Sequence, residues 1–312
     1  MGYLDLSKQE LEKEYGNLVK RFEEIKGMGL NLNMARGKPG KEQLDLSLPM
    51  LDTINSKSDF IGEDKMDCRN YGLLNGITEC RKLFADILGV DAENVIVGGS
   101  SSLNMMFDTI AGFMTKPVVE GCKPWYEVKN RKFLCPAPGY DRHFAITEYF
   151  DFDLIAVPMT ENGPDMDVVE KLVENDDSIK GIWCVPKYSN PLGITFSDET
   201  VKRFAALKPA AKDFRIMWDN AYCVHDVTDT PDELLSLMAE CRKTGNVDLP
   251  IMFTSTSKIT FPGSGVAAMA ASDNNMKVIK NRYQYQVISY DKMKTEYEAI
   301  EEEVEEIDLA CS

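Results

Sequence analysis

Hydrophobic and polar positions change their spacing along the chain, and this change separates an N-terminal helix from a longer alternating region. Residues 7–26 carry an apolar stripe at helical spacing, which predicts an amphipathic helix. Ser7 and Glu10 have the spacing of a capping box at its start. A loop rich in Gly, Pro and charged residues follows, and residues 78–88 are predicted to form a second helix.

From residue 94 onward, short β-branched or aromatic runs alternate with helical patterns. The predicted strands cover residues 95–97, 132–135, 154–157, 182–185, 214–218, 251–254 and 266–270. The predicted helices cover residues 101–113, 165–175, 198–207, 231–243 and 274–282. This alternation predicts an α/β fold with a mostly parallel, seven-stranded sheet that helices cover.

Polar residues with useful chemistry cluster after several of the predicted strands. These clusters lie at residues 98–102, 138–142, 190–193, 219–222 and 255–258. In open α/β sheets, ligands bind at the carboxyl ends of the strands. The sequence therefore predicts that these clusters meet in one ligand site.

The segment Gly99, Ser100 and Ser101 lies between a predicted strand and a predicted helix. Backbone N–H groups and the positive end of a helix dipole bind anions at such a point. Serine at this position is equally typical of a simple N-cap. Both interpretations stay open on this segment alone.

Asp219 ends the apolar strand FRIMWD, where a carboxylate is costly unless it has a cationic or donor partner. It could be a helix cap, a metal ligand or the partner of a protonated pyridine nitrogen. Lys258 follows another strand, among small hydroxyl residues, where burial can make a lysine nucleophilic. A solvated surface charge is the ordinary alternative for any single lysine.

Three further polar residues also allow two interpretations each. Tyr222 could reach a cofactor oxygen or pack in the core, and Tyr140 could stack on an aromatic ring or likewise pack in the core. Asn190 precedes Pro191 and could belong only to a turn. The joint order of these residues along the chain favours the functional interpretation.

Composition limits the classes of partner. The chain has 312 residues and a formal net charge of −16, which argues against nucleic acid and against an anionic membrane surface. It has two histidines, His143 and His225, and no HExxH motif, so we expect no metal centre. Eight cysteines without a CxxC pair, a polar N-terminus and no apolar run of membrane length predict a cytoplasmic protein.

Over roughly residues 30–290, the chain resembles the fold-type I pyridoxal-5′-phosphate (PLP) enzymes, class I aminotransferases in particular. It is most similar to the MocR-like aminotransferase group, whose members include aspartate aminotransferases. The resemblance rests on the fragments MARGKPGKEQLDLS, RNYGLLNGITECRKLFADILG, PAPGYDRHF, VPKYSNPLG, WDNAYCVHD and TSTSKITFPGSGVAA. The last four together are specific, whereas any one alone would not be.

The resemblance implies roles for the polar residues after the strands. Lys258 would carry PLP as an imine, and Asp219 would bond the pyridine nitrogen. Tyr222 and Asn190 would bond the phenolic oxygen of the ring, and Tyr140 would stack on the ring. The phosphate would be held by Gly99, Ser100, Ser101, Ser255 and Ser257.

The resemblance also implies residues that act on the substrate or on a neighbouring subunit. Tyr71 would reach the phosphate of the partner in a homodimer, and Gly37 would lie near the substrate carboxylate. Arg142 either pairs with the side-chain carboxylate of a dicarboxylic amino acid, which its planar fork suits, or forms a structural ion pair.

Two departures from the family pattern affect these expectations. The stretch ITFPGSGVAA after Lys258 has no arginine to neutralise the phosphate, and no arginine for the substrate α-carboxylate is identified after Ala270. We expect residues 1–50 to form part of a small domain and residues 51–290 to form the PLP-binding large domain. Residues 291–312 would begin a truncated C-terminal segment, so the small domain is expected to be incomplete.

The expected function is transfer of an amino group from an amino acid, aspartate in the first place, to a 2-oxo acid such as 2-oxoglutarate. A PLP lyase, decarboxylase or acyl-transferring synthase on the same fold would share the cofactor residues. The chain could also be an aminotransferase-like effector domain of a transcriptional regulator, or a PLP-binding chain without catalytic activity.

Overall fold

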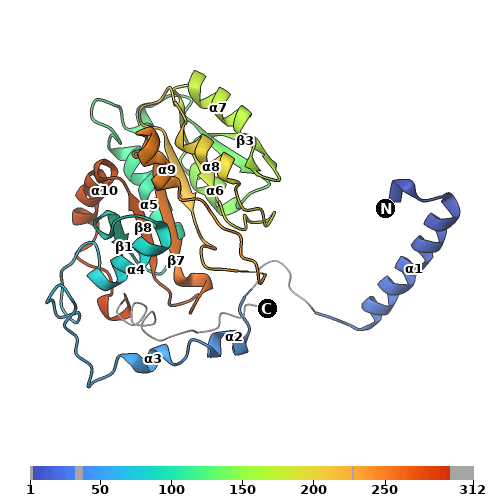
Figure 1. Cartoon of the computed structure of the whole chain (residues 1–312), viewed down its shortest axis with the longest axis horizontal. Coiled ribbons are helices and arrows are strands. Elements are labelled where there is room, and N and C mark those ends of the chain that lie inside the picture. The colour runs from blue at the N-terminus through green and yellow to red at the C-terminus, as the bar shows by residue number, and fades with distance from the viewer. Residues whose placement is uncertain (1–2, 32–37, 227, 296–312) are drawn as a thin grey trace. The chain divides into compact units, whose positions relative to one another are not determined.

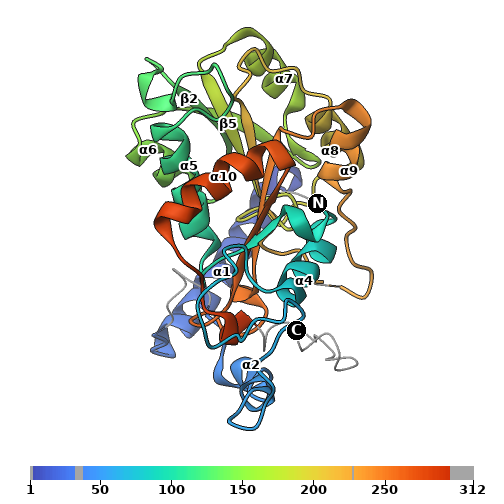
Figure 2. The same cartoon turned by 90° about the vertical axis from the view of Figure 1, so that its left-hand side faces the viewer.

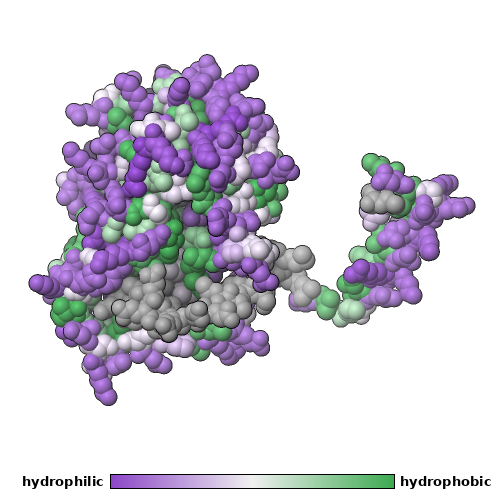
Figure 3. Space-filling model, in the orientation of Figure 1, coloured by the Kyte–Doolittle hydropathy of each residue, from purple (hydrophilic) through white to green (hydrophobic). Residues whose placement is uncertain are grey.

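The computed structural model describes residues 3–31, 38–226 and 228–295, and the chain divides into two units, residues 1–43 and 44–312. The first unit contains η1 (Tyr3–Asp5) and α1 (Lys8–Gly27). The predicted capping box is confirmed, since Ser7 accepts from the Glu10 backbone and the Glu10 side chain accepts from the Ser7 backbone. The apolar stripe of α1 is exposed (Figure 3). The predicted domain boundaries at residues 50 and 290 stay predictions.

The second unit is built on one eight-stranded sheet with the order β1-β8-β7-β6-β5-β2-β3-β4 (Figures 1 and 2). The strands are β1 (Val95–Val97), β2 (Lys132–Ala137), β3 (Asp153–Thr160), β4 (Gly163–Pro164), β5 (Ile179–Cys184), β6 (Arg215–Asp219), β7 (Pro250–Ser255) and β8 (Ala267–Ala271). The predicted α/β fold is confirmed, and each of the seven predicted strands has a counterpart. The eighth, β4, has two residues, too few for a hydrophobic pattern to reveal it.

Strands β7, β6, β5, β2 and β3 are parallel neighbours in that order. Strand β8 runs antiparallel between β1 and β7, and β4 pairs antiparallel with β3 at the edge. The carboxyl ends of the parallel strands therefore meet along one edge of the sheet, where the polar clusters of the sequence lie.

Helices cover both faces of the sheet. The covering helices are α4 (Thr78–Leu88), α5 (Ser102–Thr115), α6 (Asp141–Tyr149), α7 (Met166–Asn175), α8 (Asp198–Ala205), α9 (Leu237–Thr244) and α10 (Asp273–Gln286). The short helices α2 (Lys41–Asp45) and α3 (Met50–Thr53) precede them in the chain, and the 3-10 turns are η2 (Ala92–Asn94), η3 (Trp125–Glu127) and η4 (Thr256–Lys258). Side chains alternate across each strand, so Trp218 joins a core with α4, α7, α8 and α9, whereas Met217 joins a core with α5, α6 and α10. No helix in the described part of the chain has the length and apolar character of a membrane span.

The short helices α2 and α3 were not predicted, because their five and four residues are too few for a hydrophobic period. Two of the covering helices also differ from the sequence prediction. Helix α9 begins at Leu237 rather than at residue 231, because Ser236 supplies its N-cap by accepting from the Ala239 backbone. Helix α6 was not predicted, because polar His143 and Thr147 share its buried face with Ile146 and interrupt the apolar period.

The centre of the sheet tolerates no side chain at Gly181 of β5. A Cβ atom there would lie 2.5 Å from the Phe133 ring and 2.6 Å from the Arg215 carbonyl oxygen. The ring of Phe133 thus packs directly on the backbone of β5, inside the core that α5, α6 and α10 cover.

We expect Gly181→Ala to lower the free energy of unfolding by about 1–3 kcal/mol, because the new methyl group overpacks a fixed backbone contact. Gly263→Ala is the matched control, since a Cβ atom at Gly263 meets no atom within 4 Å, and its effect should stay within about 0.5 kcal/mol. Urea unfolding followed by tryptophan fluorescence measures both. Equal stability of the two variants would contradict the packing described for Gly181.

Candidate active site

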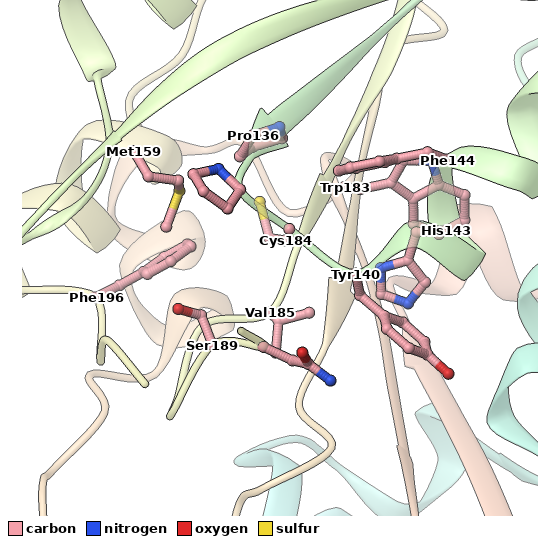
Figure 4. A pocket seen from close by; sticks show the side chains of 13 residues that line it. Pro136, Tyr140, His143, Phe144, Met159, Trp183, Cys184, Val185, Ser189 and Phe196 are labelled. Atoms are coloured by element: carbon pink, nitrogen blue, oxygen red, sulfur yellow. The ribbon is translucent and has the colours of Figure 1, made fainter. Parts of the chain in front are cut away.

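A small cavity of about 60 Å³ opens at the carboxyl ends of the parallel strands. Its lining includes Tyr140, Asn190, Asp219, Tyr222 and Lys258, together with Val185 and Ala221. The structure therefore brings five of the predicted site residues together from four separate segments of the chain. A neighbouring recess, drawn in Figure 4, shares Tyr140, Val185 and Asn190 with this cavity.

Asp219 is the last residue of β6 and is 5% exposed. Its Oδ2 accepts a hydrogen bond from His143 Nε2 at 3.0 Å, whereas its Oδ1 is buried and has no hydrogen-bond partner among the described residues. Leaving a buried acceptor unpaired costs about 1–3 kcal/mol, and more for a charged group. Because Asp219 lines the cavity, Oδ1 is suited to accept from a donor on a bound molecule.

His143 is a candidate site residue that the sequence interpretation missed. It lies in the first turn of α6, is 1% exposed, and stacks on Trp183 with 4.7 Å between ring centroids (Figure 4). Tyr140 meets the His143 ring edge-on at 5.0 Å. The signal in the sequence is the spacing of three residues from Tyr140, which returns a helix to the same side. The sequence interpretation weighed this histidine only as a metal ligand.

Lys258 ends η4 directly after β7, and its side chain is exposed to solvent. Its Nζ lies 4.7 Å from the centroid of the Tyr222 ring, and the described ion pairs do not include it. The Lys258 carbonyl oxygen accepts from His225 Nε2 at 2.9 Å, which fixes the backbone that carries the amine. The Lys258 amine is therefore held at the cavity, and no ion pair of the described residues joins it to a carboxylate.

Burial sets the protonation of two residues beside Lys258. It raises the pKa of the Tyr222 phenol, against the opposing effect of a hydrogen bond with Asn190, so Tyr222 is protonated at neutral pH. Burial also lowers the pKa of His225, so its ring is neutral and carries its hydrogen on Nε2. Tyr222 is therefore a neutral hydroxyl donor in the cavity.

The predicted phosphate residues lie on two adjoining loops. Ser101 is the N-cap of α5 and accepts from the Asn104 backbone at 3.3 Å, so the N-cap interpretation holds for it. Ser257 Oγ donates to the Ser100 carbonyl oxygen at 3.1 Å and so links the loop after β7 to the loop after β1. Ser255 ends β7, and Gly99 accepts from the Ala267 backbone. An anion at the start of α5 would meet hydroxyl groups from both loops.

Besides the phosphate residues, two further predicted residues, Tyr71 and Arg142, are not among the lining of this cavity. Tyr71 is 75% exposed, and Arg142 is exposed on α6 and takes no part in the described ion pairs. Gly37 lies outside the described residues. The cavity lining contains no arginine in the part of the chain that the structure describes, and no group of three His, Cys, Asp or Glu residues there could hold a metal ion.

The mostly parallel sheet and its helices match solved structures with the aminotransferase fold, an α/β class of PLP transferases. A sequence model of the family described as aspartate amino-transferase matches residues 6–299. The chain therefore belongs to this family.

Relatives of known sequence and structure agree with this assignment. The chain is 44% identical over 273 residues to an aspartate aminotransferase from Corynebacterium glutamicum, with 88% of this chain and 63% of that protein covered. The crystal structure of an aspartate transaminase from C. glutamicum matches with a TM-score of 0.87 at 41% identity, over 95% of this chain and 69% of that one.

A more distant structure shows the fold alone. The α-aminoadipate aminotransferase from Thermus thermophilus, complexed with N-(5′-phosphopyridoxyl)-L-leucine, has a TM-score of 0.67 at 19% identity, with 86% of this chain and 64% of that chain covered. The chain spans 65% of the length of a curated relative from Mycolicibacterium smegmatis and 63% of the C. glutamicum enzyme. It thus covers somewhat less than two thirds of these proteins.

The pairing of His143 with Asp219 predicts a measurable coupling. His143→Phe keeps an aromatic ring on Trp183 but removes the donor, so we expect the free energy of unfolding to fall by about 1–3 kcal/mol. Asp219→Asn should lower the free energy of unfolding less in the His143→Phe background than in the unchanged chain. In that background the Asp219 carboxylate has already lost its donor, so its removal costs less. Urea unfolding of all four chains gives the double-mutant cycle, and a coupling energy near zero would show that the two side chains do not interact.

Proposed function

We propose that this chain carries the PLP site of an aminotransferase of the MocR-like group, which transfers the amino group of aspartate to a 2-oxo acid such as 2-oxoglutarate. The single observation that carries the proposal is the unpaired Oδ1 of buried Asp219, in a cavity that Lys258 also lines. The aspartate aminotransferase from C. glutamicum at 44% identity supports the reaction and its amino donor.

The residues present fit PLP. Asp219 Oδ1 would accept from the protonated pyridine nitrogen, and Lys258 would hold the cofactor covalently. Tyr222 and Asn190, which both line the cavity, would bind the phenolic oxygen, and Tyr140 would cover the ring. The phosphate would be held by Gly99, Ser100, Ser101, Ser255 and Ser257. When bound, PLP supplies an electron sink for bond breaking at the substrate α-carbon.

The chain's own residues then supply orientation and proton transfer. Lys258 Nζ would serve as the general base that takes the proton from the substrate α-carbon. Asp219 would accept from the protonated ring nitrogen, and His143, which donates to Asp219 Oδ2, would hold the carboxylate in the orientation that this requires. Tyr222 donates its hydroxyl hydrogen as a neutral group.

Further assignments are part of the same proposal. Arg142 would bind the side-chain carboxylate of the dicarboxylic substrate, and Gly37 would lie near its α-carboxylate. Tyr71, exposed in the single chain, would reach the phosphate in a partner subunit, so the active protein would be a homodimer. We also propose that the protein works in the cytoplasm.

We expect Lys258→Ala to abolish the visible absorbance of lysine-linked PLP, because no amine remains to form the imine. Asp219→Asn should keep this absorbance but slow amino transfer by about 10- to 150-fold, since a charge-assisted hydrogen bond of about 1.5–3 kcal/mol is lost. The measurements are an absorbance spectrum and the spectral change when aspartate is added. Retention of the lysine-linked band in Lys258→Ala would refute the site, and binding without any change on aspartate addition would refute the reaction.

Arg142→Ala tests the substrate assignment. It should lower kcat/KM for aspartate by at least about tenfold, because the substrate side-chain carboxylate loses its bidentate partner, and leave an uncharged amino donor unaffected. Steady-state rates with aspartate and alanine as donors measure the difference. Undiminished aspartate turnover would show that Arg142 does not bind the side-chain carboxylate of the substrate.

A further inference from the structure

A second cavity, of about 900 Å³, lies between α5 and α10. Helix α5 contributes Gly112 and Phe113, its C-cap Lys116 follows them, and α10 contributes Lys277 and Arg282. The candidate active site uses the other end of α5, where Ser101 is the N-cap. At 1.5 Å per residue, Ser101 and Thr109, the first lining residue on α5, lie roughly 12 Å apart along the helix.

Arg215 lines this cavity and is only 2% exposed. Its Nε donates to Asn275 Oδ1 at 2.9 Å, and its Nη1 donates to the Phe214 and Lys212 carbonyl oxygens at 2.7 and 3.4 Å. The described ion pairs include none for Arg215, since nearby Asp213 pairs with Lys180. Burial lowers the pKa of Arg215 to about 10, against the attraction of Asp248 and Asp213. This guanidinium is therefore charged at neutral pH, and its Nη2 makes no hydrogen bond within the described residues.

Arg282 lines the same cavity and also has an unpaired end. Its Nη1 donates to the Asp108 carbonyl oxygen, whereas its Nη2 is buried without a partner among the described residues. The side chain lies against Gly112, where a Cβ atom would come within 2.9 Å of both Cδ and Nε. Glycine inside a helix costs about 1 kcal/mol relative to alanine. Its presence in α5 is therefore explained by the room that Arg282 needs.

The charges around the cavity oppose those of the whole chain. Its lining has four basic residues, Lys116, Arg215, Lys277 and Arg282, and two acidic ones, Glu120 and Asp248. Asp248 already accepts from the Ser272 and Asn274 side chains. In a chain of net charge −16, this is a local excess of positive charge. Apolar side chains of Phe113, Val118, Val278 and Ile279 complete the lining.

We propose that this cavity binds an organic anion, with a carboxylate or phosphate group on Arg215 and Arg282 and an apolar body against Phe113 and Val278. Guanidinium groups bind both anions through paired, charge-assisted hydrogen bonds. The unpaired terminal nitrogens of two arginines supply the donors, and the apolar lining distinguishes such a ligand from inorganic phosphate. The site is separate from the Lys258 cavity and does not depend on the function proposed for it.

Isothermal titration calorimetry of the whole chain with benzoate, phenyl phosphate, inorganic phosphate and benzamide tests the proposal. Benzoate or phenyl phosphate should bind saturably and at least about tenfold more tightly than inorganic phosphate or uncharged benzamide, and the preferred one identifies the head group. Arg282→Gln should weaken that binding by about tenfold or more, because a charge-assisted hydrogen bond is lost.

Two further variants separate binding from folding. Gly112→Ala should weaken binding by displacing Arg282, whereas Lys171→Gln, an exposed substitution on α7 across the sheet, should leave it unchanged. Circular dichroism verifies that each variant is folded, and Arg215, whose removal endangers the fold, is left intact. The absence of saturable binding by both aromatic anions, or binding equally strong in folded Arg282→Gln, would overturn the proposal.

Discussion

The site depends on a carboxylate buried at the end of a central strand with only one of its two oxygens paired. Burying a charge is tolerated when hydrogen bonds compensate for lost hydration. For Asp219, His143 provides one such bond at 3.0 Å, and Trp183 stacks on the His143 ring and holds it in place. The remaining oxygen has no hydrogen-bond partner among the described residues. Because Asp219 lines the cavity, a bound molecule can supply the missing donor.

The parallel order of the central strands brings the other groups to this carboxylate. Strands β2, β5, β6 and β7 are consecutive neighbours in the sheet, and each ends at the same edge. The segments that follow them contribute Tyr140, Asn190, Tyr222 and Lys258 in turn. Residues separated by more than 100 positions in the chain thus line one cavity through strand pairing alone.

Whether the sequence predicted a given site residue depended on the hydrophobic pattern in which that residue lies. Strand-end residues such as Asp219 and Lys258 were predictable, because an apolar run locates the strand and parallel pairing aligns the ends. His143 was not, since α6 has no regular apolar stripe and its first turn is polar. A position next to a site residue did not predict where a side chain points either. Arg142 adjoins His143, but neighbouring helix positions point about 100° apart, and Arg142 is exposed where His143 is buried.

Two buried aspartates differ in their hydrogen bonds, and the difference distinguishes a structural carboxylate from one that can bind a ligand. Asp213 is 3% exposed, and both of its oxygens are paired, one with Lys180 Nζ at 2.8 Å and the other with Trp125 Nε1 at 2.9 Å. Asp219 is buried to a similar extent but keeps one oxygen unpaired. Since an unpaired buried polar atom costs stability, a fold retains one where a bound molecule completes it. The same reasoning applies at the second cavity. Arg215 is buried there without an ion-pair partner among the described residues, whereas Lys180 and Asp213 pair with each other.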